Sequence, residues 1–238
     1  MNIVLFCAVF PAFLLVFYIY LRDRYQREPF SQILKGVFFG VLSAGIAMFL
    51  ESTIQSLGLT TTSASTWFGA MWNAFVGAAM PEEAAKLLML WLLLRKNKYF
   101  DERFDGIVYA CCVGMGFAGT ENILYLFGNI DMWQAVAVKR AIFAVPAHFM
   151  FAVAMGYFYS KIHFRDMSWA YRSLVFVAPV ILHGIYDGIL FSAEATPQVA
   201  GIILLAFYLF CFWMFRASRR SIQEQSRADD PNNLIFRV

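Results

Sequence analysis

The stretch that decides the fold is Trp67–Leu94, WFGAMWNAFVGAAMPEEAAKLLMLWLLL, an apolar run interrupted near its middle by Pro81, Glu82, Glu83 and Lys86. As one helix this run would measure about 42 Å, which exceeds the roughly 30 Å hydrocarbon core of a bilayer. A charged side chain near the bilayer centre costs about 2.5–3.5 kcal/mol on insertion scales, so such residues usually face a water-filled cavity or one another. The stretch therefore predicts a membrane span with an internal polar site and a kink or break at Pro81.

The rest of the chain is equally apolar. Of its 238 residues, 61% are hydrophobic, compared with about 45–50% in soluble domains. The formal net charge of +3 indicates no nucleic-acid partner. The sequence therefore predicts an all-α polytopic transmembrane helix bundle of about seven spans in a lipid bilayer. The six further apolar runs are Asn2–Leu21, Gln32–Leu50, Asp105–Phe127, Gln134–Ser160, Ser173–Ser192 and Ala200–Phe215.

The loops between these runs set the expected topology. Loops rich in Lys and Arg alternate with loops that lack them, and only Lys139 and Arg140 depart from this order. The positive-inside rule then places the N-terminus outside and the C-terminus in the cytoplasm. Arg140 can pair with an acidic group inside the bundle. We expect residues 1–220 to form the bundle and residues 221–238 to form a cytoplasmic polar tail.

Ionisable side chains also lie deep in three other runs, at Glu121, His148, His183 and Asp187. Counted at 1.5 Å per residue from the outer ends of their runs, these side chains and Glu82 can share one layer of the membrane. His183 and Asp187 are four residues apart, so the carboxylate can orient the imidazole. Lys86 follows Glu83 by three residues and Glu82 by four, so it can pair with either one. The spacing therefore predicts one polar site shared by four spans.

Such a site suits two ways of activating a water molecule. In the first, a glutamate takes a proton from water while His or Asn donors stabilise the oxyanion. In the second, two histidines and a carboxylate bind a zinc ion that keeps an open position. The pattern leaves both routes open. The His-Glu-x-x-His pattern of zinc membrane proteases is absent from the sequence.

Two other classes of function use similar residues. Buried carboxylates and histidines also form proton relays, so a proton- or ion-coupled membrane transporter is the alternative function. Against it, the sequence shows no inverted repeat of the kind common in transporters. The third class is a non-catalytic scaffold that binds a partner helix. Uptake into proteoliposomes would identify a transporter, and unchanged function after alanine replacement of both Glu82 and Glu83 would identify a scaffold.

Four motifs in chain order resemble the pattern of the PrsW family of intramembrane proteases. They are Glu82-Glu83-x-x-Lys86, Phe117-x-x-x-Glu121-Asn122, His148 with the following Ala152 and Gly156, and His183-Gly184-x-x-Asp187. The resemblance covers residues 67–192, the expected catalytic core. The family is grouped with the CAAX-processing and bacteriocin-processing membrane proteases, which carry a histidine at the position of Glu121.

The resemblance implies an intramembrane endopeptidase of the bacterial inner membrane that cuts a single-pass membrane protein, typically an anti-sigma factor, near its extracytoplasmic side. Glu82 or Glu83 would activate the water. Glu121 and His148 would position the water or a metal, and His183 would be a metal ligand or an oxyanion donor. A divalent metal, zinc by preference, would bind at Glu121, His148 and His183. The remaining matched residues, in supporting roles, are Lys86, Asn122 and Asp187.

Overall fold

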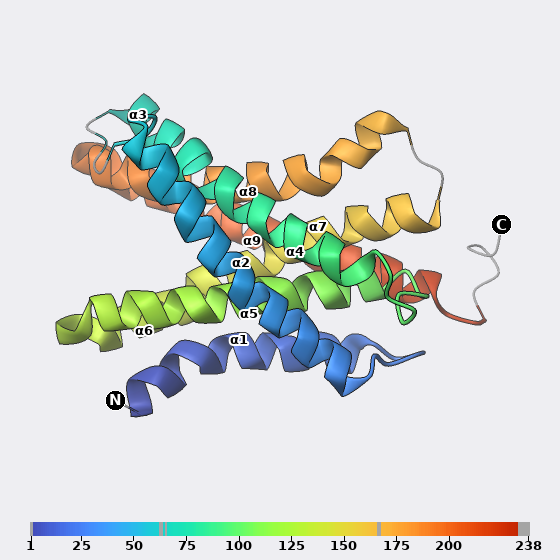
Figure 1. The fold of residues 1–238 in the computed structure, drawn as a ribbon. Coiled ribbons are helices and arrows are strands. Elements are labelled where there is room, and N and C mark those ends of the chain that lie inside the picture. The colour runs from blue at the N-terminus through green and yellow to red at the C-terminus, as the bar shows by residue number, and fades with distance from the viewer. Residues whose placement is uncertain (1, 62–63, 65, 166–167, 233–238) are drawn as a thin grey trace.

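The computed structural model describes residues 2–61, 64, 66–165 and 168–232, and this part of the chain contains helices and loops but no strand (Figure 1). The predicted all-α class is therefore confirmed. The elements are α1 (Asn2–Arg22), α2 (Phe30–Ser56), α3 (Trp67–Trp72), η1 (Asn73–Ala79), α4 (Met80–Leu94), α5 (Asp105–Gly128), η2 (Ile130–Met132), α6 (Trp133–Lys139), η3 (Arg140–Ala144), α7 (Val145–Phe164), α8 (Trp169–Ala195), η4 (Pro197–Val199) and α9 (Ala200–Ala228).

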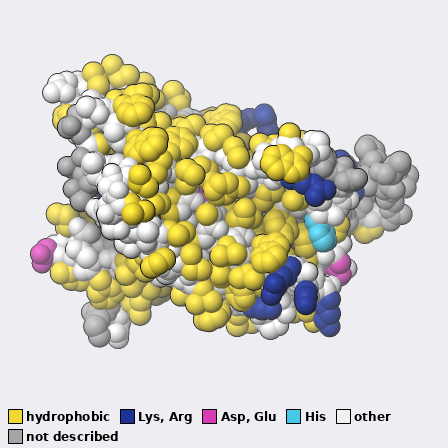
Figure 2. Space-filling model, turned by 45° about the horizontal axis from the view of Figure 1, so that its top comes forward, with side chains coloured by type: hydrophobic (Ala, Val, Ile, Leu, Met, Phe, Trp, Pro, Cys, Tyr) yellow, Lys and Arg dark blue, Asp and Glu magenta, His cyan; other side chains and the backbone are white. Residues whose placement is uncertain are grey.

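Within the described residues, six helical segments are long and apolar enough to cross a membrane. They are α1, α2, α5, the run from η2 to α7, α8, and η4 with α9. Trp67–Leu94 adds a seventh helical path through α3, η1 and α4. On the face shown in Figure 2, hydrophobic side chains cover most of the surface, and Lys and Arg side chains gather toward one end. This distribution is that of a protein whose sides contact lipid tails.

The helical path through Trp67–Leu94 is continuous at Pro81, so of the expected kink or break, the break was wrong. Immediately before the proline, η1 is a π-helix, in which the Met80 N–H donates to the carbonyl of Phe75 five residues back. A π-turn adds a residue to the helical ladder, and proline has no N–H to donate to that ladder. The wider turn therefore allows the helix to continue past Pro81. A second π-helix, η3, precedes Pro146 in α7.

Helix α5 is the centre of the bundle. About 78% of the residues in its 18-residue apolar stretch are buried. The corresponding shares are 22% for α1 and 11% for the span that includes α9. Glycines allow its neighbours to approach closely: a Cβ on Gly40 of α2 would lie 2.1 Å from the Val113 carbonyl oxygen. On the other side, a Cβ on Gly156 of α7 would lie 2.3 Å from the Gly106 carbonyl oxygen. Close backbone contact of this kind is typical of membrane helices, where small residues permit dense packing.

Part of the segment expected as a polar tail, residues 221–228, is helical. Helix α9 continues from the bundle to Ala228, and Ile222 and Gln225 are buried. Asp229 then accepts hydrogen bonds from the backbone N–H groups of Arg103, at 3.0 Å, and Phe104, at 2.7 Å. These bonds satisfy donors at the start of α5 that have no partner within the helix. Of the expected tail at 221–238, residues 233–238 lie outside the described residues.

Candidate active site

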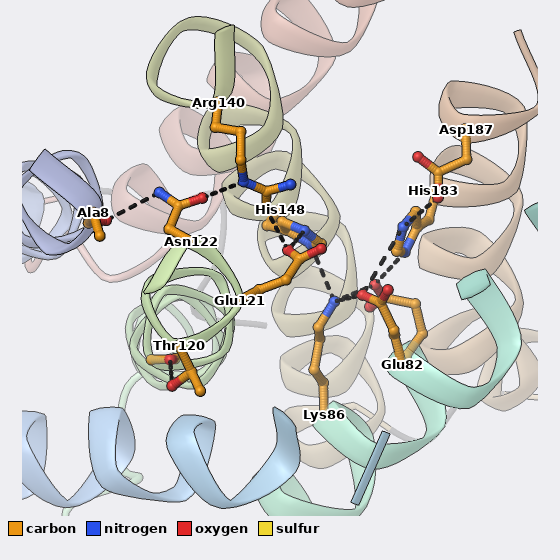
Figure 3. Close-up of polar contacts among 12 residues, drawn as sticks. Ala8, Glu82, Lys86, Thr120, Glu121, Asn122, Arg140, His148, His183 and Asp187 are labelled. Atoms are coloured by element: carbon orange, nitrogen blue, oxygen red, sulfur yellow. Dashed lines mark hydrogen bonds and ion pairs between the residues drawn. The ribbon is translucent and has the colours of Figure 1, made fainter. Parts of the chain in front are cut away.

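Polar side chains from four helical segments meet inside the bundle (Figure 3). The structure brings together every site residue that the sequence predicts. They are Glu82, Glu83 and Lys86 from α4, Glu121 and Asn122 from α5, His148 from α7, and His183 and Asp187 from α8. The site residues of α4 follow the π-helix η1 and Pro81, and His148 of α7 follows the π-helix η3 and Pro146. Pi-bulges are frequently found at functional sites.

The Lys86 ammonium lies at the centre of this group. Its Nζ is 3.2 Å from Glu82 Oε2, 2.8 Å from Glu83 Oε1 and 3.1 Å from His148 Nδ1. An ammonium has three N–H donors, so all of them are used. The Nζ atom also lies 3.9 Å from the centre of the Phe117 ring, a cation–π contact. One lysine therefore connects both glutamates to the histidine on α7.

The Lys86 contact also determines how His148 is protonated. Because the ammonium can only donate, His148 Nδ1 must accept and carries no proton. The proton of the neutral ring is then on Nε2, which lies 2.8 Å from Glu121 Oε2 and donates to it. A carboxylate partner on one ring nitrogen commonly sets the tautomer of a histidine in this way.

Arg140 completes this side of the site. Its Nη2 lies 2.7 Å from Glu121 Oε2, and its Nε donates to Asn122 Oδ1 at 2.5 Å. The guanidinium stacks over Tyr125, 4.0 Å from the ring centre. Asn122 in turn donates to the Ala8 carbonyl of α1 at 3.0 Å. The pairing of Arg140 with an acidic group of the bundle is confirmed.

His183 joins the other side of the site. Its Nδ1 is 2.9 Å from Glu83 Oε1, and its Nε2 is 3.1 Å from Asp187 Oδ2. Both ring nitrogens therefore face carboxylates, and the ring can donate to both when it is doubly protonated. The predicted pairing of His183 with Asp187 across one helical turn is confirmed. The Nε2 atom also lies 4.0 Å from Glu82 Oε2.

The two adjacent glutamates occupy different environments. The Glu83 side chain is 0% exposed, and its Oε2 has no hydrogen-bond partner within the described residues. The Glu82 side chain is 9% exposed and lines the internal cavity. Neighbouring helix positions point about 100° apart, which separates the two side chains in this way. Of the pair, only Glu82 lines the cavity.

That cavity has a volume of about 850 Å³. Besides Glu82, its polar lining includes Glu121, Arg140, His148, His183 and Asp187, and apolar residues form most of the rest. Its wall also contains Glu51, which sequence reasoning missed. The second apolar run was taken to end at Leu50, but α2 continues to Ser56 and carries Glu51 inside the bundle. The helical spacing of Glu51 from Ala44 and Ala47 was the signal available.

Four residues of the site have the donor chemistry of a metal centre. Single ligand atoms of Glu82, Glu83, His148 and His183 all lie within 4.8 Å of one another. Carboxylate oxygens and imidazole nitrogens are ligands that zinc binds. Glu121, which the resemblance placed in the ligand set, lies outside this group. Lys86 donates to three of the four residues, so an ion there would compete with the ammonium.

Comparisons with known proteins identify a family and several relatives of this chain. Residues 28–215 match the family described as PrsW family intramembrane metalloprotease. The chain is 35% identical to the Protease PrsW of Geobacillus kaustophilus over 205 residues, which cover 84% of this chain and 85% of the relative. It is 34% identical to that of Clostridioides difficile, over 87% of this chain and 85% of the relative. The protein of the same name from Bacillus subtilis is 31% identical, over 90% and 92%. No solved structure matches the chain significantly.

Proposed function

We propose that this chain, which belongs to the PrsW family of intramembrane proteases, cleaves its substrate with a water molecule that Glu82 activates. Membership of the family makes the protein a membrane-spanning protease, so the proposal concerns the mechanism and the substrate. The observation that carries it is the placement of Glu82 on the cavity wall beside Lys86 and two histidines.

In the proposed reaction, the Glu82 carboxylate takes a proton from water as the water oxygen attacks the carbonyl carbon of the scissile peptide bond. Negative charge develops on the carbonyl oxygen. His183 lines the same cavity, and its doubly protonated ring, held between Glu83 and Asp187, stabilises that charge electrostatically. Glu82 then passes the proton to the leaving nitrogen as the C–N bond breaks. Such general acid–base assistance typically contributes about 10²- to 10⁴-fold in rate.

The other charged residues position these groups. Glu83 binds Lys86 and His183 with a single oxygen and has no exposed surface, so it anchors both cations. Lys86 holds the Glu82 carboxylate at the cavity wall. Glu121, itself held by Arg140, orients His148. We therefore assign proton transfer to Glu82 and positioning to Glu83, which the sequence alone left undecided.

A divalent metal fits the donor chemistry of this site. Glu82, Glu83, His148 and His183 would hold it, and zinc suits this set of ligands. When bound, the ion would supply Lewis-acid polarisation of the substrate carbonyl. Because Lys86 donates to three of these residues, metal loading would require the ammonium to move away.

The proposed substrate is a single-pass membrane protein that resembles an anti-sigma factor and is cut near its extracytoplasmic side. The cavity supports this, because its wall includes residues near the ends of α2, α5 and α8, away from the loops rich in Lys and Arg. By the positive-inside rule, those basic loops are cytoplasmic. We place the protein in the bacterial inner membrane. The protease names of its relatives disfavour the transporter alternative.

The test is cleavage of candidate single-span substrates by the purified protein in lipid. We expect Glu82→Gln to lower kcat by about 10²-fold or more, because the amide cannot accept the proton. Asp131→Asn makes the same chemical change on an exposed turn and should leave cleavage intact. Full activity of the Glu82→Gln variant would refute the assignment. Metal content of the active protein, and activity after chelation, would show whether an ion takes part.

A further inference from the structure

Glu51 is a cavity residue for which the proposed mechanism has no role. It lies on α2 in the final two turns of that helix, and its side chain is partly buried. It lines the same cavity as Glu82, Glu121 and His183. Within the described part of the chain, its carboxylate forms no hydrogen bond and no ion pair. An ionisable group without a partner inside a membrane-spanning bundle is commonly part of a binding site.

Three other carboxylates of the cavity are paired, and a fourth, Glu194, is exposed. Glu121 binds Arg140 at 2.7 Å, Asp187 binds His183 at 3.1 Å and Glu82 binds Lys86 at 3.2 Å. Lys86 and His183 attract the charge of Glu51 from a distance, while Glu121 and Asp187 repel it. Because those two cations are already bound to other carboxylates, Glu51 is left without a counter-ion of its own.

Glu51 lies near the catalytic residues in the same cavity but is not one of them. Ala44, Ala47 and Glu51 lie on one face of α2, and all three line the cavity. Ala44 and Ala47 pack with Ala85 and Phe117, next to the Glu82–Lys86 turn. Glu51 lies one helical turn farther along α2. A substrate chain that reaches Glu82 from this end of the bundle would pass it.

We propose that Glu51 is a specificity-determining residue that binds a Lys or Arg side chain of the substrate next to the scissile bond. This inference rests on the proposed function. A basic side chain supplies the counter-ion that the carboxylate lacks, through a charge-assisted hydrogen bond. A metal ion is a poorer match, because Glu51 is not part of the group of potential ligands found among the described residues.

The experiment uses single-span model substrates with one Lys moved through the positions that flank the scissile bond, each matched by a substrate with Gln. At one position, we expect the wild-type protein to cleave the Lys substrate about tenfold to a hundredfold better in kcat/KM, as the gain of one charged hydrogen bond implies. Glu51→Gln should bring this ratio close to one. Glu51→Lys should instead favour a substrate with Glu at that position.

Two further variants control the result. Glu194→Gln changes an exposed carboxylate on the same cavity and should keep the Lys preference of the wild-type protein. Glu51→Asp keeps the charge and should keep part of the preference. Equal loss of cleavage for Lys and Gln substrates in Glu51→Gln would overturn the inference, as would a wild-type protein with no Lys preference. Failure of the wild-type protein to cleave any single-span substrate would instead overturn the proposed function and this inference with it.

Discussion

Lys86 holds one positive charge between two glutamates and a histidine, and the site depends on it. A buried charge that loses its partner is costly, because its desolvation is no longer offset by an opposite charge. Removing Lys86 would leave the Glu82 and Glu83 carboxylates side by side without their shared cation. The lysine is therefore as important to the stability of the bundle as to its chemistry.

We predict that Lys86→Gln lowers the free energy of unfolding by about 3–5 kcal/mol, the usual cost of breaking a buried ion pair. Thermal unfolding of the purified protein in detergent measures this. The matched control is Lys161→Gln, because Lys161 pairs at 2.9 Å with Glu224, whose side chain is 45% exposed. Exposed pairs contribute about 0–1 kcal/mol. Equal stability of the two variants would show that Lys86 is not the anchor we describe.

Substitutions of the two adjacent glutamates should differ in their effects on cleavage and on thermal stability. We predict that Glu83→Gln lowers both cleavage and thermal stability, because Glu83 anchors Lys86 and His183 with no exposed surface. Glu82→Gln should lower cleavage with a smaller loss of stability, since that carboxylate faces the cavity. Activity assays paired with melting curves of both variants test this. The reverse ranking of stability losses would exchange the two assigned roles.

At the scale of helices, glycine contacts decide how close α2 and α5 lie. A Cβ on Gly40 would meet the backbone of α5 at Val113, Gly116 and Phe117, at 2.1–2.9 Å. Backbone atoms cannot rotate away as a side chain can. The two helices would have to separate, and α2 carries Glu51 while α5 carries Glu121. Packing at this crossing therefore bears on the shape of the cavity.

We predict that Gly40→Ala lowers the free energy of unfolding by about 1–3 kcal/mol through overpacking. Gly45→Ala in the same helix is the control, because a Cβ there would meet nothing within 4 Å. Alanine is about 0.5–1 kcal/mol better than glycine inside a helix, so this variant should be as stable as the wild type or more so. Melting temperatures of both variants decide the matter. A Gly40→Ala variant as stable as the wild type would contradict the close approach of α2 to α5 at this residue.

For the molecule as a whole, an acidic cluster outside the apolar spans joins segments that are far apart in sequence. Burial raises the pKa of Glu28 to about 7 and that of Asp23 to about 6. Burial also raises the pKa of Glu102 to about 7, and nearby Asp229 adds to the effect. Tyr109 donates to Glu28 at 2.5 Å from α5. The cluster connects the loop between α1 and α2 to the loop before α5 and to the end of α9.

The sign of the pH effect follows from these shifts. Glu28 binds a proton more tightly in the folded protein, with a pKa of about 7, than in the unfolded chain, at its ordinary 4.5. Its contribution to stability is therefore complete below about pH 4.5 and is lost as the pH rises through 7. We predict that the melting temperature falls between pH 5 and pH 8 and that Glu28→Gln makes this fall smaller. The same change at exposed Glu194 should not alter the slope, and an unchanged slope in Glu28→Gln would contradict the prediction.

The sequence by itself determined the all-α class, the apolar runs and the polar residues that meet inside the bundle. These are local properties, because a run of apolar residues has to span the bilayer and an ionisable residue within it has to find a partner. Glu82, Glu121, His148 and His183 could be found in this way. Glu51 was missed because it lies at the edge of an apolar run, where a charge is common, and only its helical spacing from Ala44 and Ala47 pointed to the cavity.

The tertiary structure decided which atoms meet. Whether Glu82 or Glu83 faces the cavity depends on the rotation of α4, and one residue changes that direction by about 100°. The placement of α2, α4, α7 and α8 around α5 decides the other contacts. It gives Lys86 its three acceptors, lets His148 and Arg140 share one Glu121 oxygen, and leaves Glu51 unpaired among the described residues. Those placements come from contacts such as Gly40 against Val113, between residues far apart in the chain. Hydrophobic periodicity identifies the helices, but only their packing assigns each carboxylate its partner and its role.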